Sequence, residues 1–62
     1  MSFIPFMQVR YNGNIILSGL NTLYKKVEVV IMDDDEAVRH SFHAKNKRLG
    51  MEEAREWIDE NV

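Results

Sequence analysis

Residues 7–18 read MQVRYNGNIILS, two apolar-rich runs separated by the dipeptide Asn12-Gly13. Asparagine and glycine accept the positive φ angles of a type I′ turn, so this pair is a strong signal for a tight β-hairpin. Strand alternation then divides the first strand between two faces, with Met7, Val9 and Tyr11 on one and Phe6, Gln8 and Arg10 on the other. The stretch predicts two antiparallel strands that meet at this turn.

A second hairpin is predicted after residues 19–24, a segment expected to be a loop with at most one helical turn. Residues 26–32 read KVEVVIM, a β-branched run typical of a strand. The acidic run at residues 33–36 supplies a turn, because Asp side chains hydrogen-bond their own backbone. Residues 37–44 then form a partner strand, whose two faces carry Val38, His40, Phe42 and Ala44 on one side and Arg39, Ser41 and His43 on the other.

From Met51 onward the apolar residues recur at steps of three and four, which is the period of a helix. The stripe consists of Met51, Ala54, Trp57, Ile58 and Val62. Gly50 is the predicted N-cap, Leu49 a staple against Ala54, and Glu52 and Glu53 the acids of the first turn. On this stripe Trp57 is expected in the core, with a docking role as the alternative.

Together these patterns predict an α+β fold in a single domain spanning residues 1–62. It is a small antiparallel β-meander of three to four strands, with one C-terminal α-helix packed on one face. A chain of 62 residues hides only about 60% of the surface that its unfolded form exposes, so marginal stability is expected. Association with a partner subunit would bury more surface and so add stability.

Composition excludes several classes of protein. The chain has no cysteine, which excludes disulfides and thiolate zinc sites and fits a reducing compartment. Its 45% apolar content with 29% charged residues is typical of a folded chain. The first residues have neither a basic leader nor a long apolar run, so we expect no signal peptide, no membrane span and a cytoplasmic location.

Charge is distributed unevenly along the chain, although the formal net charge is only −2. Residues 1–27 carry a charge of +3, residues 28–36 carry −5, residues 37–50 carry +4 and residues 51–62 carry −4. The weak overall sign argues against non-specific binding to nucleic acids. The basic block still leaves room for a local patch.

No residues form a pattern that would support catalysis, so we expect neither an enzyme nor a cofactor nor a small-molecule substrate. His40 and His43 fall on opposite faces of the predicted strand, so we do not expect them to bind a metal ion together. We expect His40 beside Phe42 and His43 in solvent. The acidic run lacks the alternating ligands and the glycine of a calcium loop, which indicates a solvated hairpin tip.

The basic block at residues 39–48 is the best candidate for binding. With Arg10, it gives the candidate partner-binding or nucleic-acid-binding residues: Arg10, Arg39, His43, Lys45, Lys47 and Arg48. Arg39 and His43 are expected to project from the face opposite Phe42. The alternative is a solvated edge strand whose lysines block edge-to-edge aggregation.

Residues 47–58 read KRLGMEEAREWI. This segment resembles the last strand and helix start of the three-strand-plus-helix arm-binding domain of phage-type tyrosine integrases. The resemblance covers little more than the final third of the chain, and it implies a sheet that contacts DNA with a helix behind it. The sequence lacks that family's usual Phe-x-Thr lead into the helix and its basic character, so the chain is not assigned to the family.

The function we expect is a small non-catalytic protein–protein interaction module, self-associating as a homodimer, of the kind that phages and mobile elements encode. The predicted docking surface is the exposed sheet face, formed by Phe6, Val30 and Met32 beside Arg10 and Glu28. Residues 33–36 and 45–48 carry opposite charges that could pair two copies. Nucleic-acid binding through the basic block is the alternative, and acidic mimicry of nucleic acid is a third hypothesis.

Overall fold

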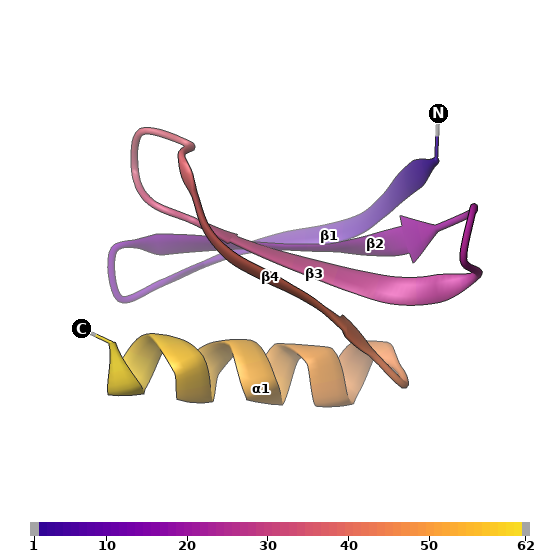
Figure 1. The fold of residues 1–62 in the computed structure, drawn as a ribbon. Helices are drawn as coiled ribbons and strands as arrows, with labels where there is room; N and C mark the ends of the chain where they lie inside the picture. Colours follow the sequence, from indigo (N-terminus) through magenta and orange to yellow (C-terminus); the bar gives the residue numbers. More distant parts are fainter. Residues whose placement is uncertain (1, 62) are drawn as a thin grey trace.

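Four strands and one helix make up the computed structural model, which describes residues 2–61. The elements are β1 (Phe3–Tyr11), β2 (Asn14–Asn21), β3 (Lys26–Met32), β4 (Val38–Ala44) and α1 (Lys47–Glu60). Each strand pairs antiparallel with the next, in the spatial order β1-β2-β3-β4. The helix lies across one face of the sheet (Figure 1). The predicted α+β meander with a C-terminal helix is therefore confirmed.

The first hairpin turns at Asn12 and Gly13, as the sequence predicts. Both residues have positive φ, at 46° and 75°, and Tyr11 pairs with Asn14 across the turn. These are the angles that a type I′ turn requires at both central positions.

Strand β2 continues to Asn21, so the predicted loop from residue 19 was wrong. Gly19 pairs with Pro5 on one side and Glu28 on the other, which holds it in a central strand. A Cβ atom at this position would lie 2.6 Å from the carbonyl oxygen of Ile4 and would also meet the ring of Phe3. The missing side chain therefore permits the close approach of β1, and the turn falls at residues 22–25 instead.

The helix begins at Lys47, four residues before the predicted start. Asn46 is the N-cap, and its side chain accepts a hydrogen bond from the backbone N–H of Leu49 at 2.9 Å. Asparagine caps a helix at least as well as glycine, because its side chain satisfies a free N–H group. The predicted cap at Gly50, the Leu49 staple and the acidic first turn were therefore wrong, and residues 47–58 contain no strand.

Two β-bulges move one residue each from the predicted face of the sheet to the other. The register passes from Pro5–Gly19 to Met7–Ser18, which leaves Phe6 as an extra residue. It likewise passes from Ile31–His40 to Met32–Val38, which leaves Arg39 as an extra residue. An extra residue interrupts the alternation of faces.

Both displaced side chains consequently contact the helix. The Nζ atom of Lys47 lies 4.3 Å from the centre of the Phe6 ring, and the guanidinium of Arg39 lies 5.2 Å from the centre of the Trp57 ring. The prediction that Phe6 shares a face with Arg10 was wrong. So was the prediction that Arg39 lies opposite Phe42, and Val38 takes its place on that side by pairing with Met32.

The core lies between the helix and one face of the sheet. Its buried members come from two strands and the helix: Ile16, Val29, Ile31, Met51, Ala54 and Ile58. Trp57 is half-buried and packs against this cluster, which agrees with the predicted helical stripe, while Val62 lies outside the described residues. Among the described residues, α1 is too short and too polar to cross a membrane.

Asn14 and Ser18 are the buried polar residues of the described chain, and Ser18 lies within the apolar layer. Ser18 is almost fully buried between Met7 and Val29 in the sheet register. Its hydroxyl has no hydrogen-bond partner among the described residues.

Candidate functional site

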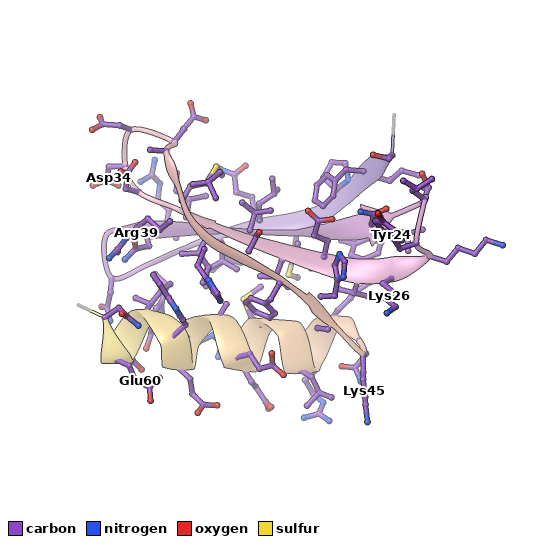
Figure 2. All side chains as sticks on the ribbon, in the orientation of Figure 1. Tyr24, Lys26, Asp34, Arg39, Lys45 and Glu60 are labelled. Atoms are coloured by element: carbon purple, nitrogen blue, oxygen red, sulfur yellow. The ribbon has the colours of Figure 1, made fainter. Side chains whose placement is uncertain are left out.

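The two ends of the sheet carry opposite charge. Because α1 runs back along the sheet from the end of β4, the β2–β3 turn and the β4–α1 connection share one end. The acidic loop (residues 33–36) and the last turn of the helix share the other. Figure 2 shows Lys26 and Lys45 at the first end, and Asp34 and Glu60 at the second.

The basic end surrounds an open hollow of about 360 Å³. Its floor is apolar and its rim is cationic, and its lining consists of Leu20, Val27, Ala44, Lys25, Lys26, His43 and Lys45. No carboxylate is among these lining residues. We call Lys25, Lys26 and Lys45 the lysine cluster.

The register of the sheet brings the lysine cluster together. Val27 pairs with Ala44, Lys26 precedes the first of these residues and Lys45 follows the second, so both lysines lie at the same end of the sheet. Lys25 ends the preceding turn in the left-handed region, at φ 56°.

An exposed aromatic pair borders the lysine cluster. The rings of Tyr24 and His43 lie 5.9 Å apart, and 62% of Tyr24 is exposed. The nearby carboxylate of Glu28 accepts a hydrogen bond from the amide of Asn21 at 2.7 Å and lies 3.6 Å from the Nε2 atom of His43. The prediction that His43 is exposed is confirmed.

The acidic loop is a turn organised by its first residue. The Oδ1 atom of Asp33 accepts hydrogen bonds from the backbone N–H groups of Asp35 and Ala37, both at 2.9 Å. This local capping leaves the carboxylates of Asp34, Asp35 and Glu36 exposed, in agreement with the predicted solvated tip. In the described part of the chain, no three His, Cys, Asp or Glu side chains are grouped to hold a metal ion.

The face of the sheet that points away from α1 carries an apolar stripe. We call this side the open face, and its stripe consists of Ile15, Leu17, Val30, Met32 and Val38. Ile15 is buried by its neighbours, the middle three are half-buried, and 64% of Val38 is exposed. Polar residues flank the stripe on both edge strands: Gln8, Arg10, Ser41 and His43.

A smaller apolar patch lies on the helix side of β1. The helix packs mainly against the other three strands, and it leaves Ile4, Phe6 and Met7 exposed by 52%, 38% and 43%. Met7 and Met51 line a hollow of about 310 Å³ here, with Lys47 among the charged residues around it.

The chain matches no family model, and no curated protein or solved structure is significantly similar to it. A function must therefore be inferred from these surfaces.

The six predicted binding residues do not form one patch. Arg10 lies at the acidic end, where its guanidinium is 3.3 Å from Asp34, and Arg39 lies there beside Trp57. Lys47 and Arg48 lie in the first turn of α1, where Arg48 pairs with Glu52 at 3.1 Å. His43 and Lys45 do lie together, but with Lys25 and Lys26, which the basic block did not include. The order of the strands in a meander puts the β2–β3 turn at the same end of the sheet as Lys45, so this order could have identified Lys25 and Lys26 as neighbours of the basic block.

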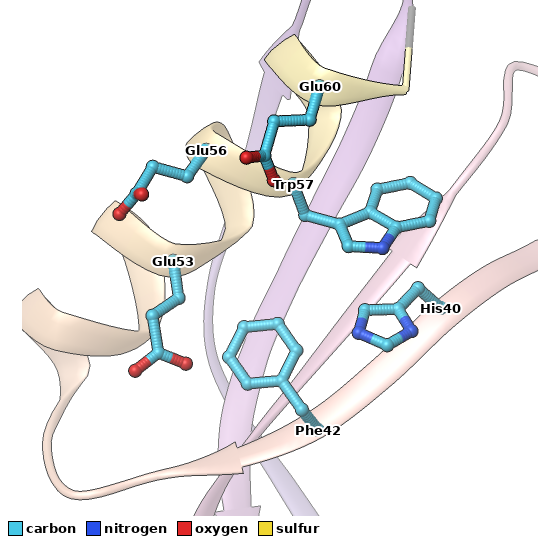
Figure 3. A pocket seen from close by; sticks show the side chains of 6 residues that line it. All are labelled: His40, Phe42, Glu53, Glu56, Trp57 and Glu60. Carbon is cyan, nitrogen blue, oxygen red and sulfur yellow. The ribbon is translucent and has the colours of Figure 1, made fainter.

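A third hollow, of about 290 Å³, lies between β4 and α1 (Figure 3). The ring of His40 stacks on Trp57 at 5.0 Å with an interplanar angle of 4°, and lies 5.6 Å from Phe42 as predicted. The surrounding carboxylates come from the helix and belong to Glu53, Glu56 and Glu60. The stacked rings of His40 and Trp57 pack the helix against β4.

Proposed function

We propose that this chain is a non-catalytic interaction module that self-associates through its open face. The observation that carries the proposal is the apolar stripe of β2, β3 and Val38, which no helix or strand of the described chain covers and of which Ile15 alone is buried. Apolar stripes rimmed by polar residues are typical of protein–protein interfaces. Val30 lies near the centre of the stripe, between Leu17 and Ser41.

Charge supports a second copy of this chain as the occupant. If two open faces meet with their strands antiparallel, a two-fold axis places the acidic loop of each copy over the lysine cluster of the other. The β3–β4 connection rises from the sheet on the side opposite the helix (Figure 1), which points the acidic loop toward such a partner. Complementary charge in this arrangement would fix the register of the dimer.

The available area fits a reversible dimer. The molecule measures 31 × 22 × 15 Å, so its broad face covers on the order of 680 Å². Two such faces have a combined area of about 1,400 Å², which is comparable with the smaller of the specific interfaces, for which about 1,200–2,000 Å² is buried. The small size of the chain supports the same conclusion, since burial of the stripe would add to a marginal core.

Sedimentation velocity from about 1 μM to about 100 μM tests the proposal. We expect the wild-type chain to shift from monomer to dimer across this range, and Val30→Glu to remain a monomer, because its charge would be buried in the interface. The matched control is Ile4→Glu, which makes the same change on the other side of the sheet. A wild-type chain that stays monomeric, or a dimer lost in Ile4→Glu and kept in Val30→Glu, would overturn the open-face interface.

A second variant tests the electrostatic contribution without altering the sheet. Asp35→Asn with Glu36→Gln removes two exposed charges from the acidic loop and keeps the Arg10–Asp34 pair. We expect dimerisation about tenfold weaker than wild type at low salt, with the difference vanishing near 0.5 M salt because exposed charges are then screened. A loss that is independent of salt would contradict the pairing of the two ends.

We also propose a cytoplasmic location, because a chain without cysteine suits a reducing compartment.

A further inference from the structure

We propose that the basic end is a binding site for the phosphate backbone of a single-stranded nucleic acid, with Tyr24 as a stacking platform. This site lies outside the open-face stripe and does not depend on dimerisation. It differs from the basic block of the sequence, because Lys25 and Lys26 replace the arginines as its cations.

The shape and charge of the hollow fit a polyanion. Three lysines and His43 surround an apolar floor, without a carboxylate among the lining residues. The lysine cluster combines one residue of the β2–β3 turn, the first residue of β3 and the residue after β4. The positive charges of this rim attract phosphates, and the release of counterions from the nucleic acid adds affinity.

The exposed aromatic side chain selects for unstacked bases. Tyr24 directly precedes Lys25, and its largely exposed ring lies 5.9 Å from that of His43, which lines the basic hollow. Bases of a single strand can stack on such a ring, while those of a duplex are already stacked on each other. Lysines beside an exposed aromatic ring are the combination found in non-specific single-strand binders. The geometry therefore favours a single strand over a duplex.

Fluorescence anisotropy with a labelled oligothymidylate of about 12 nucleotides tests the site. Three lysines predict a logarithmic salt slope near −2, which is a loss of about 20-fold in affinity between 50 mM and 200 mM salt. Lys26→Gln with Lys45→Gln should reduce the slope to about −0.7, whereas Arg10→Gln with Arg55→Gln, which removes the same charge elsewhere, should leave it unchanged. If both double variants lost affinity and salt slope equally, the oligonucleotide would be attracted by net charge alone, and the proposed site would be wrong.

The contribution of Tyr24 has a separate signature. Tyr24→Ala should weaken oligothymidylate binding about tenfold while leaving the salt slope unchanged, because stacking releases no counterions. A duplex of the same length should bind more weakly, and inorganic polyphosphate should compete equally well in the wild type and in Tyr24→Ala. No binding at low salt, tighter binding of the duplex, or an unchanged affinity in Tyr24→Ala would each overturn the proposal.

The same titration in Val30→Glu separates this proposal from the dimer. In a dimer, the partner's acidic loop would compete for the lysine cluster, so the monomeric variant should bind oligothymidylate at least as tightly as wild type. Binding by a chain that never dimerises would support the site and reject the dimer. A chain that dimerises without binding any single strand would support the dimer and reject the site.

Discussion

The hydroxyl of Tyr11 donates one bifurcated hydrogen bond to the two carboxylate oxygens of Asp59, at 2.9 Å and 3.0 Å. The amide of Asn12 donates to the same carboxylate at 3.2 Å. These bonds tie the last turn of α1 to the β1–β2 hairpin. The hydrogen bond to Asp59 raises the pKa of Tyr11 above its usual value, with desolvation and the charge of Asp59 acting in the same direction and Arg55 opposing them.

This contact predicts a loss of stability in alkaline solution. The pKa of Tyr11 is higher in the folded state than in the unfolded state. The protonated hydroxyl therefore contributes its full stabilisation below the ordinary tyrosine pKa, and this stabilisation is lost as the pH rises through the pKa of the folded state. Urea unfolding between about pH 8 and about pH 11 should show a falling free energy of unfolding in the wild type, with a smaller fall in Tyr11→Phe. Tyr24→Phe is the control and should retain the wild-type dependence. An identical alkaline slope in Tyr11→Phe would contradict the role of the Asp59 bond.

Two arginines at the acidic end should differ sharply in their effect on stability. Arg39 donates to the Oδ1 atom of the buried Asn14 at 2.7 Å and covers the ring of Trp57. Arg39→Ala should therefore lower the free energy of unfolding by about 2 kcal/mol. Arg10→Ala breaks only the exposed pair with Asp34 and should change it by less than about 0.5 kcal/mol. Thermal and urea unfolding compare the two variants, and equal effects would show that Arg39 is no more than a surface charge.

Gly50 should resist replacement by alanine although it lies inside a helix. A Cβ atom there would be 2.8 Å from the Cγ2 atom of Val29 and 3.2 Å from the Cβ atom of Ala44. Overpacking of about 1–3 kcal/mol outweighs the gain of about 1 kcal/mol in helix propensity, so Gly50→Ala should destabilise the protein by about 1 kcal/mol. A double-mutant cycle with Val29→Ala should recover part of this loss. A stabilising Gly50→Ala would show that the helix shifts freely on the sheet.

The buried hydroxyl of Ser18 predicts a stabilising substitution. Ser18 loses its hydration on folding and gains no hydrogen bond from any described residue. Removing an unsatisfied polar group eliminates its desolvation cost, so Ser18→Ala should raise the free energy of unfolding by about 1 kcal/mol. Ser18→Thr keeps the hydroxyl and serves as the control, with no such gain. A destabilised Ser18→Ala would mean that the hydroxyl is satisfied by a bound water.

Periodicity predicted the elements of this fold but not their exceptions. The alternation of apolar residues predicted the strands, and their recurrence at steps of three and four predicted the helix. Both patterns are reliable because the apolar face of each element must pack against the same core. The two bulges were not predicted, since an extra residue in a strand leaves the composition unchanged and alters only the register. Phe6 and Arg39 were therefore assigned to the wrong face.

Gly50 shows a second reason why the sequence did not predict every feature of the fold. A glycine before an apolar stripe is ordinarily a helix boundary, yet here the sheet approaches so closely that a side chain would collide with Val29. This reason is tertiary and has no local signature. The lysine cluster was missed because its members are distant in sequence, and a list of charged blocks does not consider which turns share an end of the sheet.

The strand order β1-β2-β3-β4 has a consequence for the speed of folding. Every strand pairs with its neighbour in the chain, and the helix returns directly over the sheet that precedes it. Few long loops must close before the first hairpin gains its contacts, so the entropic barrier to the native topology is low. We therefore expect the chain to fold quickly, because each hairpin that has formed offers an edge strand with which the next strand can pair.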